Sequence, residues 1–486
     1  MDAAARAKRM PAEGSLMALI DQATKRPRVD TPSMPTVDPF TLDFVIKRAR
    51  EIFSDSEADC GTRTPPKEVP QCSPATSSPA TFSPDTSSPA STPSQQELSS
   101  SAEYFPAQKY IDQLFARSHP LEIGPIRIAF PCGGIVETAP VFEAAGLVVE
   151  SVNTCYTDVH HAKLVKKLVR EHAFSTAPCF GRVKGSVLNK EISEFDGADI
   201  VVGKPPVPTW ALCASGGRSI TSHDMHEYAK FFQYIMHTIN SGELHAAIVA
   251  HPIETMTPHG RREPFLPKVM ELCAKHAPGF HWDIVELKAQ DYGLPQPDAI
   301  SFLRCMKKNH AGAMPNVLPP SCCGRLYDFL DPAEGNINRK DILSRCMRDN
   351  LLDYERHIKS LVREDPRMRS TTMVAAVNLD RKSMMLGKDG TLRSSLDHKH
   401  VFLLSTDDLH LPGPQRRVFR FISDAERLAL KGVNPGYLAK YLPSDSLRHA
   451  ACSYVPSTVY GAAAMPLINA MAASKKLCAR SREGGT

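Results

Sequence analysis

Cysteine and histidine are the side chains of this 486-residue chain that can most readily bind a metal ion or attack an electrophilic carbon. The thirteen cysteines include no CxxC pair, the spacing from which zinc ribbons and fingers are built. No cysteine stands at a ligand spacing from the histidine groups, which are His160-His161 and His223, His226 and His237. The sequence therefore predicts no metal site, and solvated or capping roles for these histidines.

A glycine pair, Gly133-Gly134, indicates a different chemistry, the binding of a cofactor. It follows the short apolar segment IRIAF (126–130) and precedes a helix-like segment that ends at Gly146. Glycines at such a turn let the backbone approach a ligand closely. A strand, a glycine turn and a helix in this order mark a candidate cofactor site, although a glycine pair after a strand is weak evidence by itself.

Apolar segments alternate with helix-like segments from residue 107 onward, and these elements must position any site. The expected strands are 126–130, 147–153, 198–203, 246–250, 282–287 and 300–305, with helices near 158–172, 228–239 and 264–276 between them. Strands that alternate with helices are typical of a doubly wound, mostly parallel α/β sheet. Ligands of such sheets bind at the carboxyl ends of the strands, so the loops after residues 130, 153, 203 and 250 are the candidate site.

Composition divides the chain into parts. Fourteen of its 40 prolines lie in residues 1–106, where a Ser/Pro-rich stretch over about 55–103 is expected to be disordered and 39–53 to form a short helix. Strand-like and helix-like segments no longer alternate regularly over 306–415, and we expect this range to form a smaller, irregular second domain. The expected organisation is a disordered basic and Ser/Pro-rich tail (1–106), an α/β domain (107–305), the second domain (306–415), a C-terminal part that completes the α/β domain (416–475) and a tail (476–486).

Several classes of protein are disfavoured by composition. No run approaches the ~18 apolar residues of a membrane helix, so we predict no membrane partner. No secretory signal is recognisable, and cysteines without one favour reduced thiols in the cytosol or nucleus.

The basic runs Lys8-Arg9 and Lys25-Arg26-Pro27-Arg28 resemble a bipartite nuclear import signal, which predicts a nuclear, otherwise a cytoplasmic, location. Ser-Pro and Thr-Pro pairs in the tail are candidate phosphorylation sites, with an unregulated linker as the alternative.

The order of several segments resembles the cytosine-5 methyltransferase family, whose members transfer a methyl group from S-adenosylmethionine to cytosine in DNA or tRNA. IAFPCGGIVETAPVFEAAG (128–146) is similar to the family's first motif, and AQDYGLPQ (289–296) to the segment leading into its eighth. RFISDAERLALKG (420–432) and ACSYVPSTVYGAA (451–463) are similar to the ninth and tenth. The resemblance covers about 124–473. It implies the methyltransferase type of doubly wound sheet, with 306–415 as the target-recognition region.

The family's catalytic positions hold different residues in this chain. In the loop VGKPPVPTW (202–210), Val207 stands where the family has its nucleophilic Cys, and valine carries no nucleophile. His251 stands where a Glu holds and protonates the base, and Asp298 where the first of two arginines follows the eighth motif. Cys213 lies six residues after Val207, and its thiol could in principle replace the missing nucleophile. A cysteine more often serves as a small buried side chain than as a nucleophile. The resemblance therefore predicts no catalytic residue.

The cofactor positions are kept in part. The resemblance places Phe130, Gly133 and Gly134 at the S-adenosylmethionine site. Thr154 stands near the acidic residue that would bind the ribose hydroxyls, and Ser186 where the family often has an Asp against the adenine. S-adenosylmethionine is thus the cofactor that the resemblance implies, with these residues as its candidate contacts.

Nucleic acid, DNA or RNA, is the partner that the resemblance implies. The candidate contacts are Gln296, which ends the eighth-motif segment, and Arg416, Arg417 and Arg420, which lead into the ninth. Arginines that hold phosphates give affinity by releasing counterions and read no sequence. A solvated surface of mixed charge is the alternative. The net charge of +5 permits a nucleic-acid partner without requiring one.

The chain keeps segments similar to the family's framework motifs, but other residues stand at the family's catalytic positions. This combination predicts a cytosine-5 methyltransferase-like protein without catalytic activity. We expect it to act in the nucleus as a nucleic-acid-binding, regulatory or scaffold protein, with an active methyltransferase or a chromatin protein as its protein partner. One alternative is an active S-adenosylmethionine-dependent DNA or RNA methyltransferase with altered catalytic residues. The other is an interaction module that binds neither cofactor nor nucleic acid.

Overall fold

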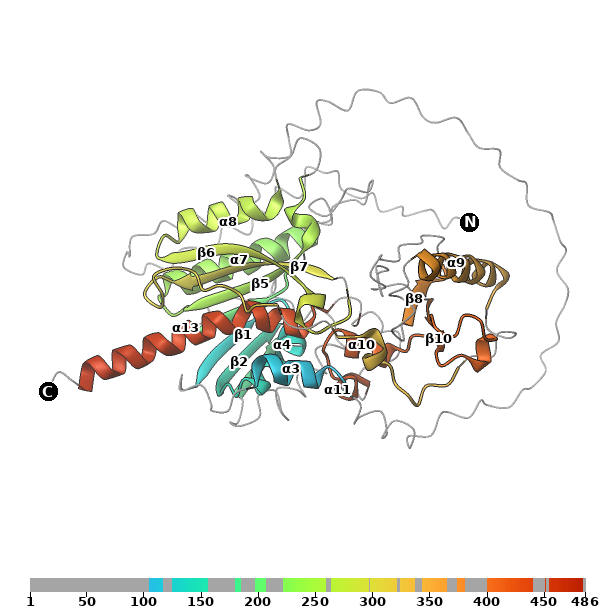
Figure 1. Cartoon of the computed structure of the whole chain (residues 1–486). Coiled ribbons are helices and arrows are strands. Elements are labelled where there is room, and N and C mark those ends of the chain that lie inside the picture. The colour runs from blue at the N-terminus through green and yellow to red at the C-terminus, as the bar shows by residue number, and fades with distance from the viewer. Residues whose placement is uncertain are drawn as a thin grey trace, which may run out of the picture. The chain divides into compact units, whose positions relative to one another are not determined.

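The computed structural model (Figure 1) describes twelve stretches and one single residue of the chain. These are 105–116, 125–155, 180–184, 197–206, 222–258, 264–296, 298–320, 324–336, 343–364, 374–380, 400–439, 451 and 454–483. The chain divides into two units, 1–39 and 40–486, and every described residue belongs to the second. The expected N-terminal tail up to residue 104 and the expected helices 39–53 and 158–172 lie outside these residues.

A seven-stranded sheet forms the larger part of the described fold, with strand order β3-β2-β1-β4-β5-β7-β6. Its strands are β1 (Ile126–Phe130), β2 (Val149–Cys155), β3 (Phe180–Lys184), β4 (Ile200–Gly203), β5 (Ala246–Pro252), β6 (Phe280–Lys288) and β7 (Ala299–Lys307). Neighbouring strands from β3 to β5 are parallel, and β7 alone runs antiparallel to both of its neighbours. The expected doubly wound, mostly parallel α/β sheet is confirmed. Strand β3 was not expected, because FGRVK has only one aliphatic residue, between two cations.

Helices cover both faces of this sheet, as the two apolar cores show. One core joins the sheet to α3 (Gln108–Phe115), α4 (Ile135–Ala144) and the front of α13 (Ser457–Glu483). The other joins it to α7 (Ser222–Asn240) and α8 (Phe265–His276). Figure 1 shows α13 crossing beside α4 on its face of the sheet. The front of α13, in the C-terminal part of the chain, therefore packs into the core of the α/β fold.

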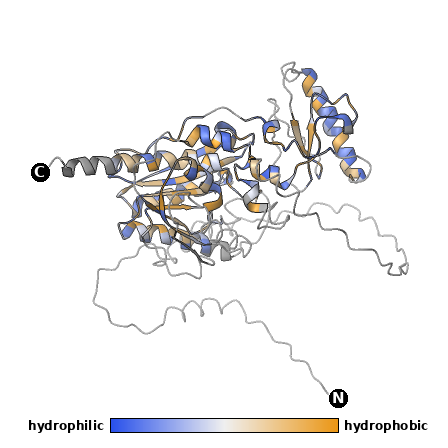
Figure 2. Ribbon diagram, turned by 90° about the horizontal axis from the view of Figure 1, so that it is seen from below, coloured by the Kyte–Doolittle hydropathy of each residue, from blue (hydrophilic) through white to orange (hydrophobic). Residues whose placement is uncertain are grey.

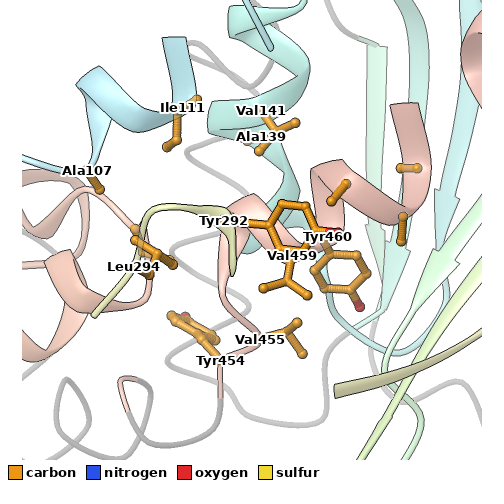
Figure 3. Packing of buried hydrophobic residues seen from close by; sticks show 14 of the residues in the cluster. Ala107, Ile111, Ala139, Val141, Tyr292, Leu294, Tyr454, Val455, Val459 and Tyr460 are labelled. Carbon is orange, nitrogen blue, oxygen red and sulfur yellow. The ribbon is translucent and has the colours of Figure 1, made fainter. Parts of the chain in front are cut away.

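Helix α13 packs closely because it presents a glycine to its neighbours. In Figure 3, Val459 and Tyr460 of α13 lie beside Val141 and Ala139 of α4 and close to Tyr292. Gly461 is buried between these helices, and a Cβ added to it would meet Cγ1 of Val141 at 2.6 Å and the ring of Phe115. A larger residue at this position would push the two helices apart.

Gly461→Ala is therefore expected to lower the free energy of unfolding by about 1–3 kcal/mol, the usual cost of overpacking, although alanine favours a helix more than glycine does. Urea unfolding measures the effect. Gly279→Ala is the matched control, since an added Cβ there meets no atom within 4 Å. Equal effects of the two substitutions would contradict the close packing of α13.

A second, smaller sheet is antiparallel and has the order β10-β9-β8. It consists of β8 (Val374–Asn378), β9 (Val401–Ser405) and β10 (Phe419–Phe421), and α9 (Arg345–Glu364) packs on it through a separate apolar core. The expected second domain thus contains a regular helix–sheet pair. Because β10 pairs with β9, this sheet extends past the expected boundary at 415.

The segment after β10 begins α10 (Asp424–Leu430). The side chain of Ser423 accepts from the backbone N–H of Glu426, and Glu426 accepts in return from the N–H of Ser423, which is a capping box. α11 (Pro435–Ala439) follows. Among the described residues, no helix combines the length and the apolar character needed to cross a membrane.

Candidate functional site

The glycine turn lies at the carboxyl end of β1, where the strand order reverses between β2 and β4. This is the place where doubly wound sheets bind their ligands. Gly133 and Gly134 have φ values of 72° and 103°, in the left-handed region that only glycine adopts easily. Gly134 then caps α4, and its carbonyl accepts from the hydroxyl of Thr138 at 2.8 Å. The expected strand, glycine turn and helix are all present.

The glycine turn, the end of β4 and the front of α13 meet here. The hydroxyl of Tyr460, at the front of α13, donates to the carbonyl of Gly203 at the end of β4 over 3.0 Å. A Cβ on Gly134 would meet that hydroxyl and Cγ1 of Val202, each at 3.5 Å. The structure therefore brings together the segments similar to the family's first and tenth motifs and the end of the fourth strand.

Glu137 is the residue of this site that the sequence analysis missed. It lies in the first turn of α4, is buried, and its Oε2 atom has no hydrogen-bond partner among the described residues. Burial raises the pKa of this carboxyl, partly offset by the charge of Lys204 and by backbone N–H groups of Glu137 and Val455. The signal in the sequence is an acid within the apolar run IVETAPVF, directly after a glycine turn.

Of the other predicted cofactor residues, Phe130 and Thr154 lie in the part of the chain that the structure describes. Phe130 is fully buried at the end of β1 and pairs in register with Thr154 of β2. Thr154 is also fully buried, and its hydroxyl has no partner among the described residues. Ser186 lies outside the described residues, as do Val207 and Cys213.

His251, at the family's glutamate position, lies near the end of β5 in a buried aromatic pocket. Its Nδ1 is 3.2 Å from the carbonyl of Val249, so Nδ1 carries the proton. Its Nε2, 3.0 Å from the hydroxyl of Tyr228, then accepts that hydroxyl's proton. Burial lowers the pKa of His251 from 6.5 to about 4, against the opposing effect of the Val249 carbonyl. At neutral pH the ring is uncharged, and neither nitrogen is available to protonate a base.

Gln296 and Asp298 connect two distant segments. The buried amide of Gln296 donates to the carbonyl of Leu430. Asp298 forms an ion pair with Lys431, whose side chain is buried. These contacts join the segment similar to the eighth motif to the end of α10. Gln296, the candidate nucleic-acid contact, and Asp298, which stands at an arginine position of the family, thus both take part in holding the framework together.

The three candidate phosphate-binding arginines have different environments. Arg416 pairs with Glu355 of α9 at 2.8 Å, and Arg420 pairs with Glu426 at 2.5 Å, with only 4% and 5% of these arginine side chains exposed. Arg417 is 54% exposed and lies 3.7 Å from Asp408. Arg416 and Arg420 therefore belong to buried structural ion pairs, and Arg417 alone of the three is accessible.

S-adenosylmethionine carries an ammonium, a carboxylate and a ribose diol, against which the site can be tested. Glu137 fits the ammonium, because its buried Oε2 is an acceptor without a described partner. Gly133 leaves open space at the turn, since a Cβ there would meet nothing within 4 Å. Thr154 supplies one hydroxyl for the ribose and no carboxylate. The described residues fit the amino-acid end of this cofactor.

No protein-family model matches this chain, and neither does any curated protein. Similar solved structures include a protein described as a DNA modification methyltransferase encoded within an Escherichia coli prophage, with 14% identity, a TM-score of 0.43, and 72% of this chain and 99% of that one covered. The methyltransferase EhMeth of Entamoeba histolytica is 11% identical, with a TM-score of 0.42 and coverage of 71% and 98%. The Dnmt2 methyltransferase of S. pombe is 11% identical, with a TM-score of 0.36 and coverage of 71% and 98%. All three TM-scores are below 0.5.

Proposed function

We propose that this chain is a cytosine-5 methyltransferase-like protein that does not methylate cytosine through a cysteine nucleophile and acts in the nucleus as a nucleic-acid-binding regulatory or scaffold protein. The sequence motifs support the family, and Val207 removes the nucleophile from the matching position. Its protein partner would be an active methyltransferase or a chromatin protein.

The arrangement of His251 is the observation that carries this proposal. The family position it occupies needs a group that can give a proton to the base. His251 is buried, and its two nitrogens are engaged by Val249 and Tyr228. Asp298, at an arginine position, is paired with Lys431. Restoring the nucleophile alone would therefore leave the base without its proton donor.

Transfer of radiolabelled methyl from S-adenosylmethionine to DNA and to RNA tests the proposal. We expect no label in cytosine from the natural chain or from Val207→Cys, because His251 supplies no proton. Cofactor binding is followed in parallel by calorimetry, and nucleic-acid binding by fluorescence anisotropy. Label in cytosine from the natural chain would overturn the proposal and would direct mutagenesis to Cys213 and His251.

An active methyltransferase with altered residues is the second candidate, and Glu137 is the observation that favours it. The bound cofactor would supply an electrophilic methyl group. On this chain's side, Glu137 would hold the ammonium and Gly133 would admit the cofactor to the turn. An unsatisfied buried acceptor costs about 1–3 kcal/mol, a cost that a bound ligand with a donor would remove.

Glu137→Gln is expected to gain stability relative to the natural chain as the pH rises from 5 to 8. A carboxyl whose folded pKa is raised weakens folding as the pH rises above its unfolded value, and the amide does not ionise. Urea unfolding at pH 5 and pH 8 measures this, with Glu150→Gln at an exposed position of β2 as the control. If the natural chain binds the cofactor, the same substitution should weaken binding. A stability difference between Glu137→Gln and the natural chain that is the same at pH 5 and pH 8 would contradict the raised pKa of this carboxyl.

A further inference from the structure

Two histidines face each other at the end of the large sheet opposite to the candidate site. His245 directly precedes β5, and His310 follows the end of β7 by three residues. Because β7 runs antiparallel to β5, the end of β7 lies beside the start of β5. Nε2 of His310 is 2.8 Å from Nδ1 of His245, and the ring centroids are 4.8 Å apart. These two residues are here called the histidine pair.

The histidine pair lies in polar surroundings, although the strands of the large sheet are mostly hydrophobic (Figure 2). On one side, Nε2 of His245 is 3.9 Å from Oδ1 of Asp199, which directly precedes β4. On the other side, Nδ1 of His310 is 3.0 Å from the hydroxyl of Ser474 on α13. Each ring therefore turns one nitrogen toward its partner and the other toward an oxygen.

The framework fixes the positions of these groups. The backbone N–H of His245 donates to the carbonyl of Asp199 at 2.8 Å, and that of Lys307 donates to the carbonyl of His245 at 2.9 Å. The N–H of His310 donates to the carbonyl of Lys307 at 3.1 Å, and Arg127 holds the carboxylate of Asp199 at 3.1 Å. The fold thus joins two histidines that are 65 residues apart. A search for short ligand spacings in the sequence does not find such a pair.

Two imidazole nitrogens this close can share either a proton or a metal ion. Imidazole binds Zn²⁺, Cu²⁺ and Ni²⁺. Two nitrogens that each lie about 2.0–2.1 Å from one tetrahedral Zn²⁺ are about 3.3 Å apart. The separation of 2.8 Å in the histidine pair differs from this by about half an ångström, a shift that small rotations of the two rings supply.

The outer nitrogens of the histidine pair have the partners that metal-binding histidines need. A ligating imidazole commonly donates its other ring N–H to a carboxylate or another oxygen, which fixes the ring and its tautomer. The carboxylate of Asp199 and the hydroxyl of Ser474 lie on those two sides. With a metal between the rings, His245 would carry its proton on Nε2 and His310 on Nδ1, where it would donate to Ser474.

We propose that the histidine pair binds one divalent transition-metal ion of the kind that imidazole prefers, such as Zn²⁺ or Cu²⁺. The ion replaces the proton shared between the two rings. The described residues contain no group of three or more His, Cys, Asp or Glu side chains that could hold a metal, so within that part of the chain water supplies the remaining ligands. Water can reach the site, since 23% of the His245 side chain is exposed.

Titration calorimetry of the full chain with ZnCl₂ tests this site, after purification through a tag without histidine. We expect the tightest class of sites to hold one ion per chain. His245→Gln/His310→Gln should weaken that site at least tenfold, because glutamine can form hydrogen bonds there but offers no imidazole nitrogen. His357→Gln/His410→Gln removes two other accessible histidines and should leave the site unchanged. Circular dichroism checks that all variants fold.

Two single substitutions separate metal binding from hydrogen bonding. His310→Cys should keep Zn²⁺ binding, since a thiolate is a good zinc ligand, whereas His310→Gln should lose it. Ser474→Ala should weaken Zn²⁺ binding by about tenfold without changing the number of ions, as expected for a residue that only orients a ligand. With Cu²⁺, electron paramagnetic resonance should show coupling to imidazole nitrogens in the natural chain and not in His245→Gln/His310→Gln.

Each contrary outcome is distinct from a failure of the proposed function. Equal Zn²⁺ affinity in the natural chain and His245→Gln/His310→Gln would overturn the inference, as would an equal loss in His357→Gln/His410→Gln. Mg²⁺ binding as tight as Zn²⁺ binding would point to oxygen ligands and overturn it too. A natural chain that binds neither Zn²⁺ nor Cu²⁺ at the pair would also refute it. None of these results bears on methyl transfer, because the pair lies at the amino ends of β4 and β5, away from the glycine turn.

Discussion

Glu426→Ala is expected to lower the free energy of unfolding by about 3–5 kcal/mol, the range measured when one partner of a buried ion pair is removed. Glu426 and Arg420 are 1% and 5% exposed, and two guanidinium nitrogens of Arg420 donate to the carboxylate at 2.5 and 2.8 Å. Without the carboxylate, the arginine charge would stay buried, and its acceptors among the described residues would be the carbonyls of Phe421 and Asp331.

The same carboxylate also holds two backbone groups. It accepts from the N–H of Ser423 at 2.9 Å, which begins α10, and from the N–H of Asp331 at 2.8 Å. Alanine leaves both donors without this acceptor, and loss of a helix cap alone costs about 1 kcal/mol. Glu426 thus joins β10, α10 and the segment at residue 331, and its loss should affect all three.

Urea unfolding followed by circular dichroism measures this effect. Asp353→Ala is the control, because it removes an exposed ion pair with Arg356, and such pairs are worth about 0–1 kcal/mol. The double variant Arg420→Met/Glu426→Leu should be more stable than Glu426→Ala, since it leaves no unpaired charge. An effect of Glu426→Ala as small as that of Asp353→Ala would show that the pair is accessible to water.

Much of the fold could be predicted from local patterns. The buried strands are short apolar runs, and the start of α10 was readable from the spacing of Ser423 and Glu426. The antiparallel β7 could not be predicted, because its run of apolar residues carries no mark of direction. The predicted end of the second domain, residue 415, falls before β10, because FRF belongs to a segment whose similarity to the ninth motif gave no sign of its pairing with β9.

The candidate site was predictable in position and less so in chemistry. The location of the site at the carboxyl ends of β1 and β4 could be predicted from the alternation of strands and helices. The environments of the arginines did not, because Arg416 pairs with Glu355, 61 residues away on α9, and no local pattern connects them. The protonation state of His251 likewise depends on Tyr228, 23 residues earlier on α7. Burial and long-range pairing decide what a charged side chain does. The spacing of residues along the sequence shows neither of them.

Acid is expected to destabilise the protein through His251, by up to about 3 kcal/mol between pH 6.5 and pH 4. Burial lowers the pKa of this imidazole from 6.5 to about 4. Within that interval the imidazole is protonated in the unfolded chain but stays neutral in the folded protein. The contribution of the neutral imidazole is therefore fully present above pH 6.5 and is lost as the pH falls toward 4.

His251→Gln isolates this contribution from the titration of carboxylates. Glutamine does not titrate, and its side-chain oxygen can still accept from the hydroxyl of Tyr228. At pH 8 the variant should be less stable than the natural chain by about 1–2 kcal/mol, a common cost of a core substitution. The difference should shrink as the pH falls and vanish or reverse near pH 4.5, as measured by urea unfolding at each pH. His281→Gln, at a partly exposed position of β6, is the matched control.

The pH profile also bears on the chemistry of the site. A stability difference that narrows only below pH 6.5 would show that His251 is neutral in the folded protein at pH 7, with Nδ1–H turned to Val249 and Nε2 accepting from Tyr228. An imidazole in that state has no proton to give to a cytosine ring nitrogen. A difference that stays constant from pH 8 to pH 4.5, or follows the His281→Gln control, would instead mean that the imidazole ionises freely. His251 would then return as a candidate acid, and the proposed loss of methyl transfer would rest on Val207 alone.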